Sequence, residues 1–238
     1  MKLDILAFAA HPDDIELSAG GTIIKAVKEG KKVGIVDLTK GELGSRGSSV
    51  IRGDEAAAAA EILGLSIREN LGLTDGFFEI NQDSQLEVVR MIRKYQPEIV
   101  LANAVSDRHP DHGKGAELVH KSAFLSGLIK IKTEVDGEEQ AAWRPKRVFH
   151  YIQDHYIEPD FVVNITDEFE DKLKSIMAYS SQFFNPVGDG VKTPISGEDF
   201  VKFIEGRARQ MGREAGFEMG EGFTVSNPLG VESLFDVK

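Results

Sequence analysis

The sequence predicts an α/β fold with a mostly parallel sheet flanked by helices. Apolar runs alternate with helical patterns through the first 130 residues, as expected when each strand is followed by a crossover helix. The chain has 238 residues, enough for one domain with a substantial buried core. We therefore expect a single domain in which residues 1–130 form a sheet-and-helix core, and residues 131–238 complete the sheet and wall the site.

Strands and helices are expected to alternate in the first part of the chain. The most secure helix spans residues 51–64, because consecutive alanines from Ala56 to Ala60 favour a helix and Gly64 is a typical helix stop. The strands are expected near residues 2–9, 33–38, 67–71 and 98–102, and the other helices near residues 19–29, 84–95 and 112–127.

The remaining segments are expected to surround one edge of this sheet. Residues 39–49 follow the second strand and are rich in glycine and serine, which predicts an irregular loop facing the substrate. After residue 130, two β-like stretches are expected at 148–153 and 160–165, and two helical segments at 167–180 and 197–215.

The charge and the cysteine content exclude several kinds of function. Lys and Arg number 28 and Asp and Glu number 39, for a net charge of −11, so a nucleic-acid partner is not expected. Cysteine is absent, which excludes disulfides, thiolate catalysis and cysteine-ligated zinc. The N-terminus lacks the layout of a signal peptide, and no apolar run approaches about 20 residues. We therefore expect a cytoplasmic protein without a membrane partner.

Two acid-and-imidazole clusters follow predicted strands. His11-Pro12-Asp13-Asp14 comes directly after the first apolar run, and His109-Pro110-Asp111-His112 follows the run from Glu98 to Ala102. The carboxyl ends of parallel strands open onto one crevice, where α/β sheets keep their ligands. The sequence therefore predicts that the two clusters form one metal site.

The residue types in these clusters suit zinc catalysis. Zinc that catalyses hydrolysis usually has three protein ligands and one open position, and His11, Asp14 and His112 would supply such a set. Asp13 cannot face the metal in the same way as its neighbour, so we expect it to remain free as a general base. The alternative is that Asp13 caps a helix that starts near Ser18.

Two further residues have both a functional and a structural interpretation. With Asp111 nearby, His109 could become a positively charged donor to an oxyanion or to a leaving amine, or it could be purely structural. Arg52 could reach an anionic substrate group across the crevice, or it could be a solvated residue at a helix start. Gly20-Gly21 lacks the G-x-G-x-x-G pattern, which argues against a nucleotide site.

The two motifs resemble those of the LmbE-like, or PIG-L, family of zinc-dependent de-N-acetylases. The resemblance implies a Rossmann-like fold and commonly a homo-oligomer, often a hexamer. It implies zinc, or another divalent metal, on His11, Asp14 and His112. It also implies Asp13 as general base and His109 as its electrostatic or acid partner, oriented by Asp111. The signals of the resemblance are the segment from Ala10 to Asp14, followed by Glu16 and Gly20–Thr22, and the segment from Asp107 to His112. Finer similarity continues in Gly41–Gly44, Arg52, Tyr179–Phe183 and Glu221–Phe223.

Within this family the chain is most similar to the N-acetylglucosaminyl-malate deacetylases of bacillithiol biosynthesis. That similarity implies this substrate or a related small N-acetylglucosamine compound. The malate carboxylates would need cationic partners, and Arg52 and Arg108 are the local candidates. Glu42 is a further candidate substrate contact. Phe200 stands where some relatives have a tyrosine, so any hydroxyl contact from that position is lost here.

The expected reaction is hydrolysis of an acetamide. Zinc would polarise the carbonyl, Asp13 would take a proton from water, and zinc with His109 would hold the oxyanion. Two alternatives stay open: hydrolysis of another acyl or phosphate ester at the same metal, and metal-dependent sugar binding without turnover. Asp13 argues against the second alternative, because binding alone needs no free base beside the ligands.

Overall fold

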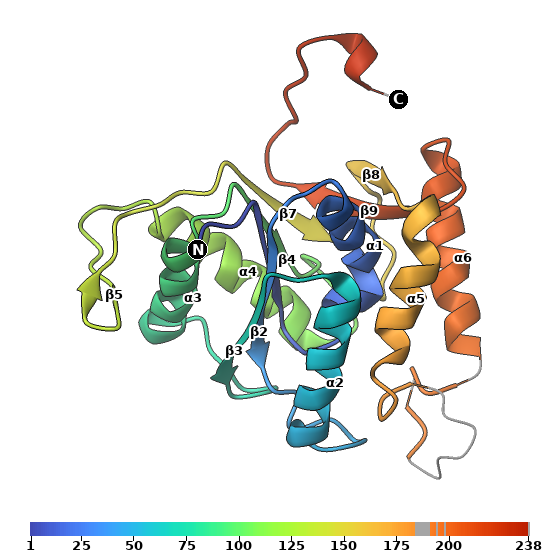
Figure 1. Ribbon diagram of the computed structural model, residues 1–238, viewed down its shortest axis with the longest axis horizontal. Helices are drawn as coiled ribbons and strands as arrows, with labels where there is room; N and C mark the ends of the chain where they lie inside the picture. Colours follow the sequence, from blue (N-terminus) through green and yellow to red (C-terminus); the bar gives the residue numbers. More distant parts are fainter. Residues whose placement is uncertain (184–190, 194, 198, 238) are drawn as a thin grey trace.

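The computed structural model describes residues 1–183, 191–193, 195–197 and 199–237. These residues form an α/β fold around a seven-stranded sheet with the strand order β3-β2-β1-β4-β7-β9-β8, which confirms the predicted fold class (Figure 1). The strands of this sheet are β1 (Ile5–Ala9), β2 (Val33–Thr39), β3 (Ile67–Leu73), β4 (Ile99–Ala102), β7 (Arg147–Tyr151), β8 (Phe161–Asn164) and β9 (Gly220–Val225).

Helices cover both faces of the sheet. In Figure 1, α3 and α4 lie to the left of the sheet, and α1, α2, α5 and α6 lie to the right. A short antiparallel pair and two turns of 3-10 helix complete the described elements. The helices are α1 (Asp14–Lys28), α2 (Ser49–Leu63), α3 (Gln82–Tyr95), α4 (Pro110–Leu125), α5 (Phe169–Met177) and α6 (Asp199–Glu214), and the small elements are β5 (Glu134–Val135), β6 (Glu138–Glu139), η1 (Thr166–Glu168) and η2 (Leu234–Asp236).

The central strand β1 is buried on both faces, as parallel strands between two helical layers are. Leu6 and Phe8 point into the core beneath α3 and α4. Ile5, Ala7 and Ala9 point into the core beneath α1 and α2. A third apolar cluster joins α2, α5 and α6. This continuous apolar character explains why the first strand was predictable from the sequence.

The strand β9 was not expected from the sequence. It runs antiparallel between β7 and β8, although it contains Gly220 and Gly222, and glycine is rare in strands. The glycines allow close packing against α6: a Cβ at Gly220 would lie 2.9 Å from Gly212, and one at Gly222 would lie 2.9 Å from Sδ of Met211. The local composition is therefore that of a loop, and tertiary packing makes it a strand.

Helix α1 begins at Asp14 rather than near residue 19, so this predicted boundary was wrong. Gly20 and Gly21 consequently lie inside the helix. A Cβ at Gly21 would lie 2.8 Å from the side chain of Ile165, so glycine is needed for the close approach of α1 to that residue. These glycines are packing residues, which agrees with the argument against a nucleotide site.

The connections of β1 and β4 position the site. These neighbouring strands are parallel, but the chain leaves β1 toward β2 on one side and leaves β4 toward β7 on the other. The loops after the two strands therefore separate and leave a crevice at their carboxyl ends, the usual ligand position in such sheets. Among the described helices, none is long and apolar enough to cross a membrane.

Candidate functional site

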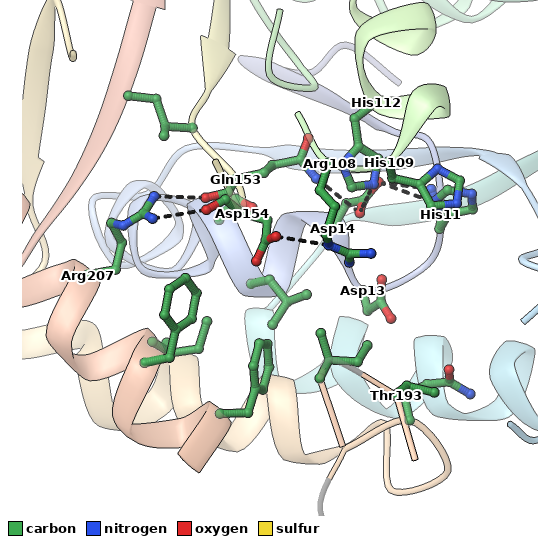
Figure 2. A pocket seen from close by; sticks show the side chains of 18 of the residues that line it. His11, Asp13, Asp14, Arg108, His109, His112, Gln153, Asp154, Thr193 and Arg207 are labelled. Carbon is green, nitrogen blue, oxygen red and sulfur yellow. Dashed lines mark hydrogen bonds and ion pairs between the residues drawn. The ribbon is translucent and has the colours of Figure 1, made fainter. Parts of the chain in front are cut away.

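A cavity of about 330 Å³ lies at the carboxyl ends of β1 and β4. One side of it carries the two acid-and-imidazole clusters, and the other side is formed largely by α6. Figure 2 shows His11, His109 and His112 gathered near Asp14, with Asp13 beside them. The fold thus brings together the two motifs as the sequence predicted.

The three predicted metal ligands meet at the Asp14 carboxylate. Its Oδ1 atom lies 3.1 Å from Nε2 of His112, and its Oδ2 atom lies 3.9 Å from Nδ1 of His11. The side chains are at least nine-tenths buried. Two nitrogen donors and one oxygen donor of this kind match the ligand types that zinc prefers in catalytic sites.

A second carboxylate lies behind each imidazole. Nε2 of His11 is 2.9 Å from Oδ1 of Asp75, and Nδ1 of His112 is 2.5 Å from Oδ2 of Asp107. Each ring therefore presents one nitrogen to Asp14 and the other to an outer carboxylate, an arrangement that fixes the tautomer and orientation of metal-binding histidines. Sequence reasoning assigned no role to either outer carboxylate. Their signal was positional: Asp75 lies just after β3, and Asp107 lies two residues before the second cluster.

Two amides hold Asp14 itself. Nδ2 of Asn103 donates to Oδ2 at 2.9 Å, and Nε2 of Gln153 donates to Oδ1 at 3.1 Å. Asn103 comes directly after β4, and Gln153 follows β7. These residues were also missed, because an amide after a strand carries no spacing signal of its own.

The electrostatics of this cluster fit a bound cation. Burial acts to lower the pKa of His11, but hydrogen bonds with Asp111 and Asp75 outweigh it and raise that pKa to about 10. Burial also acts to lower the pKa of His112, but Asp14 and Asp107 outweigh it and raise that pKa to about 9. Positive charge is thus strongly favoured among these carboxylates. A divalent metal would supply that charge and release the imidazole protons, as metal binding to histidine does.

Two overlapping groups could contribute ligand atoms. The nitrogens of His11, His109 and His112 all lie within 4.8 Å of one another, and so do donor atoms of His11, Asp75 and Asp111. Both groups share His11. The assignment of Asp14, rather than Asp75 or Asp111, as the third ligand therefore stays a prediction.

Asp13 lies in the same cavity and is not a helix cap. It occupies the residue before α1, with φ of 117°, but its side chain makes no capping hydrogen bond, so the capping alternative was wrong. Its Oδ2 atom is 3.5 Å from an Arg52 guanidinium nitrogen. Burial raises the pKa of Asp13 to about 7, while Arg52 acts to lower it. The carboxyl can therefore exchange a proton near neutral pH, as a general base must.

His109 is oriented differently from the expectation. Its Nδ1 atom accepts a hydrogen bond from the backbone N–H of Asp111 at 3.2 Å, which leaves Nε2 as the protonated nitrogen. Burial, followed by His11 and His112, lowers the pKa of His109, so the ring is a neutral donor rather than a charged one. The Asp111 carboxylate instead accepts from the backbone N–H of Gly76 at 2.7 Å.

Two of the three predicted substrate contacts line the cavity, and the third does not. Arg52 and Arg108 line the cavity, and Arg108 donates to Asp154 at 2.9 Å. Glu42 is not among the described residues that line it. Its carboxylate accepts from the backbone N–H groups of Lys40 at 3.2 Å and Asp75 at 3.0 Å. Glu42 therefore orders the loop and supports Asp75, and its assignment as a substrate contact stays a prediction.

The wall opposite the clusters is apolar. Phe200 is nine-tenths buried and stacks on Phe183 with ring centroids 5.4 Å apart. It thus contributes packing and no hydroxyl. The apolar side chains of the wall are Leu17, Ile152, Ile195, Phe200, Phe203, Ile204 and Met211.

Comparisons with known proteins agree with this geometry. Residues 6–123 match the model of the PIG-L family, described as GlcNAc-PI de-N-acetylase. The diacetylchitobiose deacetylase of Thermococcus kodakarensis is 29% identical over 75% of this chain and 70% of its own length. A Bacillus cereus protein, "Probable N-acetyl-alpha-D-glucosaminyl L-malate deacetylase 2", is 26% identical over 76% of this chain and 84% of its own.

A solved structure is similar over almost the whole chain. The conserved protein TT1542 from Thermus thermophilus has a TM-score of 0.86 and 34% sequence identity, and the match covers 98% of both chains. The likeness therefore includes the parallel core, with its two motifs, and also the segments that form the apolar wall.

Proposed function

This chain belongs to the PIG-L family of metal-dependent deacetylases, and on that premise we propose that it removes the acetyl group from an N-acetylglucosamine-type substrate. The observation that carries the proposal is the position of Asp13. It is a buried carboxyl without a capping role, in the same cavity as the group formed by His11, Asp14 and His112. Binding a metal or a sugar requires no such group, whereas hydrolysis requires a base.

Each polar group has one part in this reaction. A divalent metal, which we propose to be zinc, supplies a Lewis acid for the acyl carbonyl and lowers the pKa of water when it is bound. Asp13 accepts a proton from the attacking water. The Nε2–H of neutral His109 donates a hydrogen bond to the developing oxyanion, and Asp13 passes the proton that it accepted from water to the departing nitrogen. The amide C–N bond then breaks, and acetate and a free amine are released.

N-acetylglucosaminyl-malate is the finer candidate substrate, supported by the sequence similarity to the Bacillus cereus relative. Its two carboxylates would need cations, and Arg52 and Arg108 are both at the cavity. However, each guanidinium already has a carboxylate partner, Asp13 and Asp154 respectively. A malate group would have to compete with these pairs, so we extend the proposal only to N-acetylglucosamine-type substrates as a class.

The proposal is tested by amine release together with metal content. Protein loaded with zinc should release amine from N-acetylglucosamine derivatives, and removal of the metal with a chelator should abolish the release. His112→Ala should hold far less than one zinc per chain, because two protein ligands are too few for a catalytic site.

Three results would contradict the proposal or its parts. Stoichiometric tight zinc in the His112→Ala protein would contradict the ligand assignment. Sugar binding without any amine release would favour the alternative of a binding protein. Hydrolysis of acyl or phosphate esters, with no hydrolysis of acetamides, would favour the other enzymatic alternative.

A further inference from the structure

The apolar wall of the cavity lies opposite the group that would cleave the amide. Phe200, Phe203, Ile204 and Met211 come from α6, and Ile152 lies beside them in the cavity lining. Sugar hydroxyl groups need hydrogen-bond partners, and burying them against such a surface costs free energy. The wall is therefore suited to a part of the substrate other than the hydroxyl edge of a sugar.

Phe203 is the accessible end of an ordered aromatic stack. Its side chain is 40% exposed, whereas Phe200 is 9% exposed. Its ring centroid lies 6.1 Å from that of Phe200 at an angle of 20°, and Phe200 stacks in turn on Phe183. The guanidinium of Arg207 lies 5.3 Å from the Phe203 ring centroid. The stack thus offers a preformed aromatic surface at the cavity, and aromatic rings bind apolar groups well on such surfaces.

Most of the described cations of the cavity already have a carboxylate partner. Among the described residues that line it, the Lys and Arg side chains are Arg52, Arg108, Lys172 and Arg207. Arg52 and Arg108 have carboxylate partners, and Lys172 donates to Glu221 at 2.6 Å.

Arg207, the fourth of these cations, is held by neutral groups. It donates to the backbone carbonyls of Gln153 and Asp154, each at 3.0 Å. An anionic substituent would have to compete with the carboxylate partners of Arg52, Arg108 and Lys172, and of these four described cations only Arg207 donates to neutral carbonyls alone. The charge distribution therefore favours a neutral substituent over a charged one.

From these observations we infer that the substrate is a glycoside of N-acetylglucosamine whose aglycone is uncharged and apolar, an aryl or alkyl group that lies against Phe203 and its neighbours. This inference rests on the proposed function. The acetamide lies at the metal group, and the aglycone lies along α6. The parallel core then performs the reaction, and the apolar wall selects the substrate.

The inference is tested by comparing kcat/KM for amine release from a set of substrates. The set contains N-acetylglucosamine, its phenyl glycoside, diacetylchitobiose, N-acetylglucosaminyl-malate and N-hexanoylglucosamine. For the zinc-loaded protein we expect the phenyl glycoside to exceed free N-acetylglucosamine by about tenfold or more, the factor that contact of one aromatic group with such a surface provides.

Substitutions at the wall should change the ratio between substrates. Phe203→Ala should bring the ratio of phenyl glycoside to free sugar close to one, and Phe203→Leu, which keeps an apolar side chain, should retain part of it. Phe203 is partly exposed, so neither change should prevent folding. Phe235→Ala is the matched control: this phenylalanine is 97% exposed in the C-terminal segment, and the ratio should be unchanged.

The outcomes separate this inference from the proposed function. Release of amine at equal kcat/KM from all substrates would overturn the inference alone. The same holds for a preference for the malate glycoside, for diacetylchitobiose or for the N-hexanoyl compound, which would place a charged group, a second sugar or the acyl chain in the cavity. A failure to release amine from any of the five by zinc-loaded protein would overturn the proposed function, and with it the inference.

Discussion

The two sides of the cavity are built from different parts of the chain and by different forces. Residues 1–125 supply the parallel strands β1 to β4 and all of the predicted metal ligands. The segment from β7 to β9 supplies an antiparallel edge of the sheet together with α5 and α6. The first region presents imidazoles and carboxylates, and the second presents apolar side chains, most of them from α6, together with polar ones.

This difference matches two separate tasks: the first region positions the reacting groups, and the apolar wall contributes to the choice of substrate. Each polar group of the first region is fixed by a directional contact close to a strand end, such as the hydrogen bonds from Asn103 and Gln153 to Asp14. Reacting groups need this precision, because small displacements reduce catalysis greatly. The apolar wall needs only shape and area. Substitutions in the first region should therefore slow all substrates by one factor, and substitutions in the wall should change the ratio between them.

The largest effect among the following substitutions is expected for Asp13→Asn. The amide keeps the size of the side chain but cannot accept a proton, so kcat should fall by about 10²–10⁴ for every substrate. Zinc content should stay near one per chain. The check is kcat measured for two different N-acetyl glycosides, with zinc determined on the same samples. Nearly normal turnover would place the base elsewhere in the first region.

A smaller effect is expected for Asp107→Asn, which weakens the outer partner of His112. The loss of such a partner typically lowers metal affinity by about 10–100-fold. Zinc affinity is measured by competition with a chelator. Asp171→Asn serves as the control, because Asp171 pairs with Lys28 and Lys174 at the surface and is not among the described residues that line the cavity. Equal zinc affinity in the wild type and in the Asp107→Asn protein would show that the contact does not support the metal.

The smallest of these effects is expected for Arg52→Ala. This substitution tests most directly whether a residue of the first region affects all substrates by the same factor. Arg52 faces Asp13 at 3.5 Å, so its loss should reduce kcat/KM by roughly tenfold, the lower end for a charge-assisted contact. The factor should be the same for N-acetylglucosaminyl-malate and for N-acetylglucosamine. A selective loss for the malate glycoside would instead show that Arg52 binds the anion, as the sequence first suggested.

Much of the first region was predictable because its signals are local. Apolar runs indicated β1, β2 and β4, and the consecutive alanines with Gly64 indicated α2. The two motifs at strand ends indicated a shared crevice. These features depend on neighbouring residues and on the general rule that parallel strands end at one edge.

The second region was less predictable because its signals are distributed. The strand β9 is rich in glycine, and its pairing depends on β7, β8 and α6 being in place. The apolar residues of α6 fit a helix in any fold, since an amphipathic pattern shows that a face is buried but not what it faces. Only the tertiary structure directs part of that face into the cavity.

The sequence by itself determined the α/β class, the order of the first strands and helices, and the two motifs that meet at the crevice. Tertiary structure alone decided which partners these residues have. Asp75 contacts His11 from 64 positions away, Gln153 contacts Asp14 from 139 positions away, and Arg52 faces Asp13. The reason is physical: local pattern fixes which face or strand end a residue occupies, whereas contacts between distant residues depend on the path of the whole backbone.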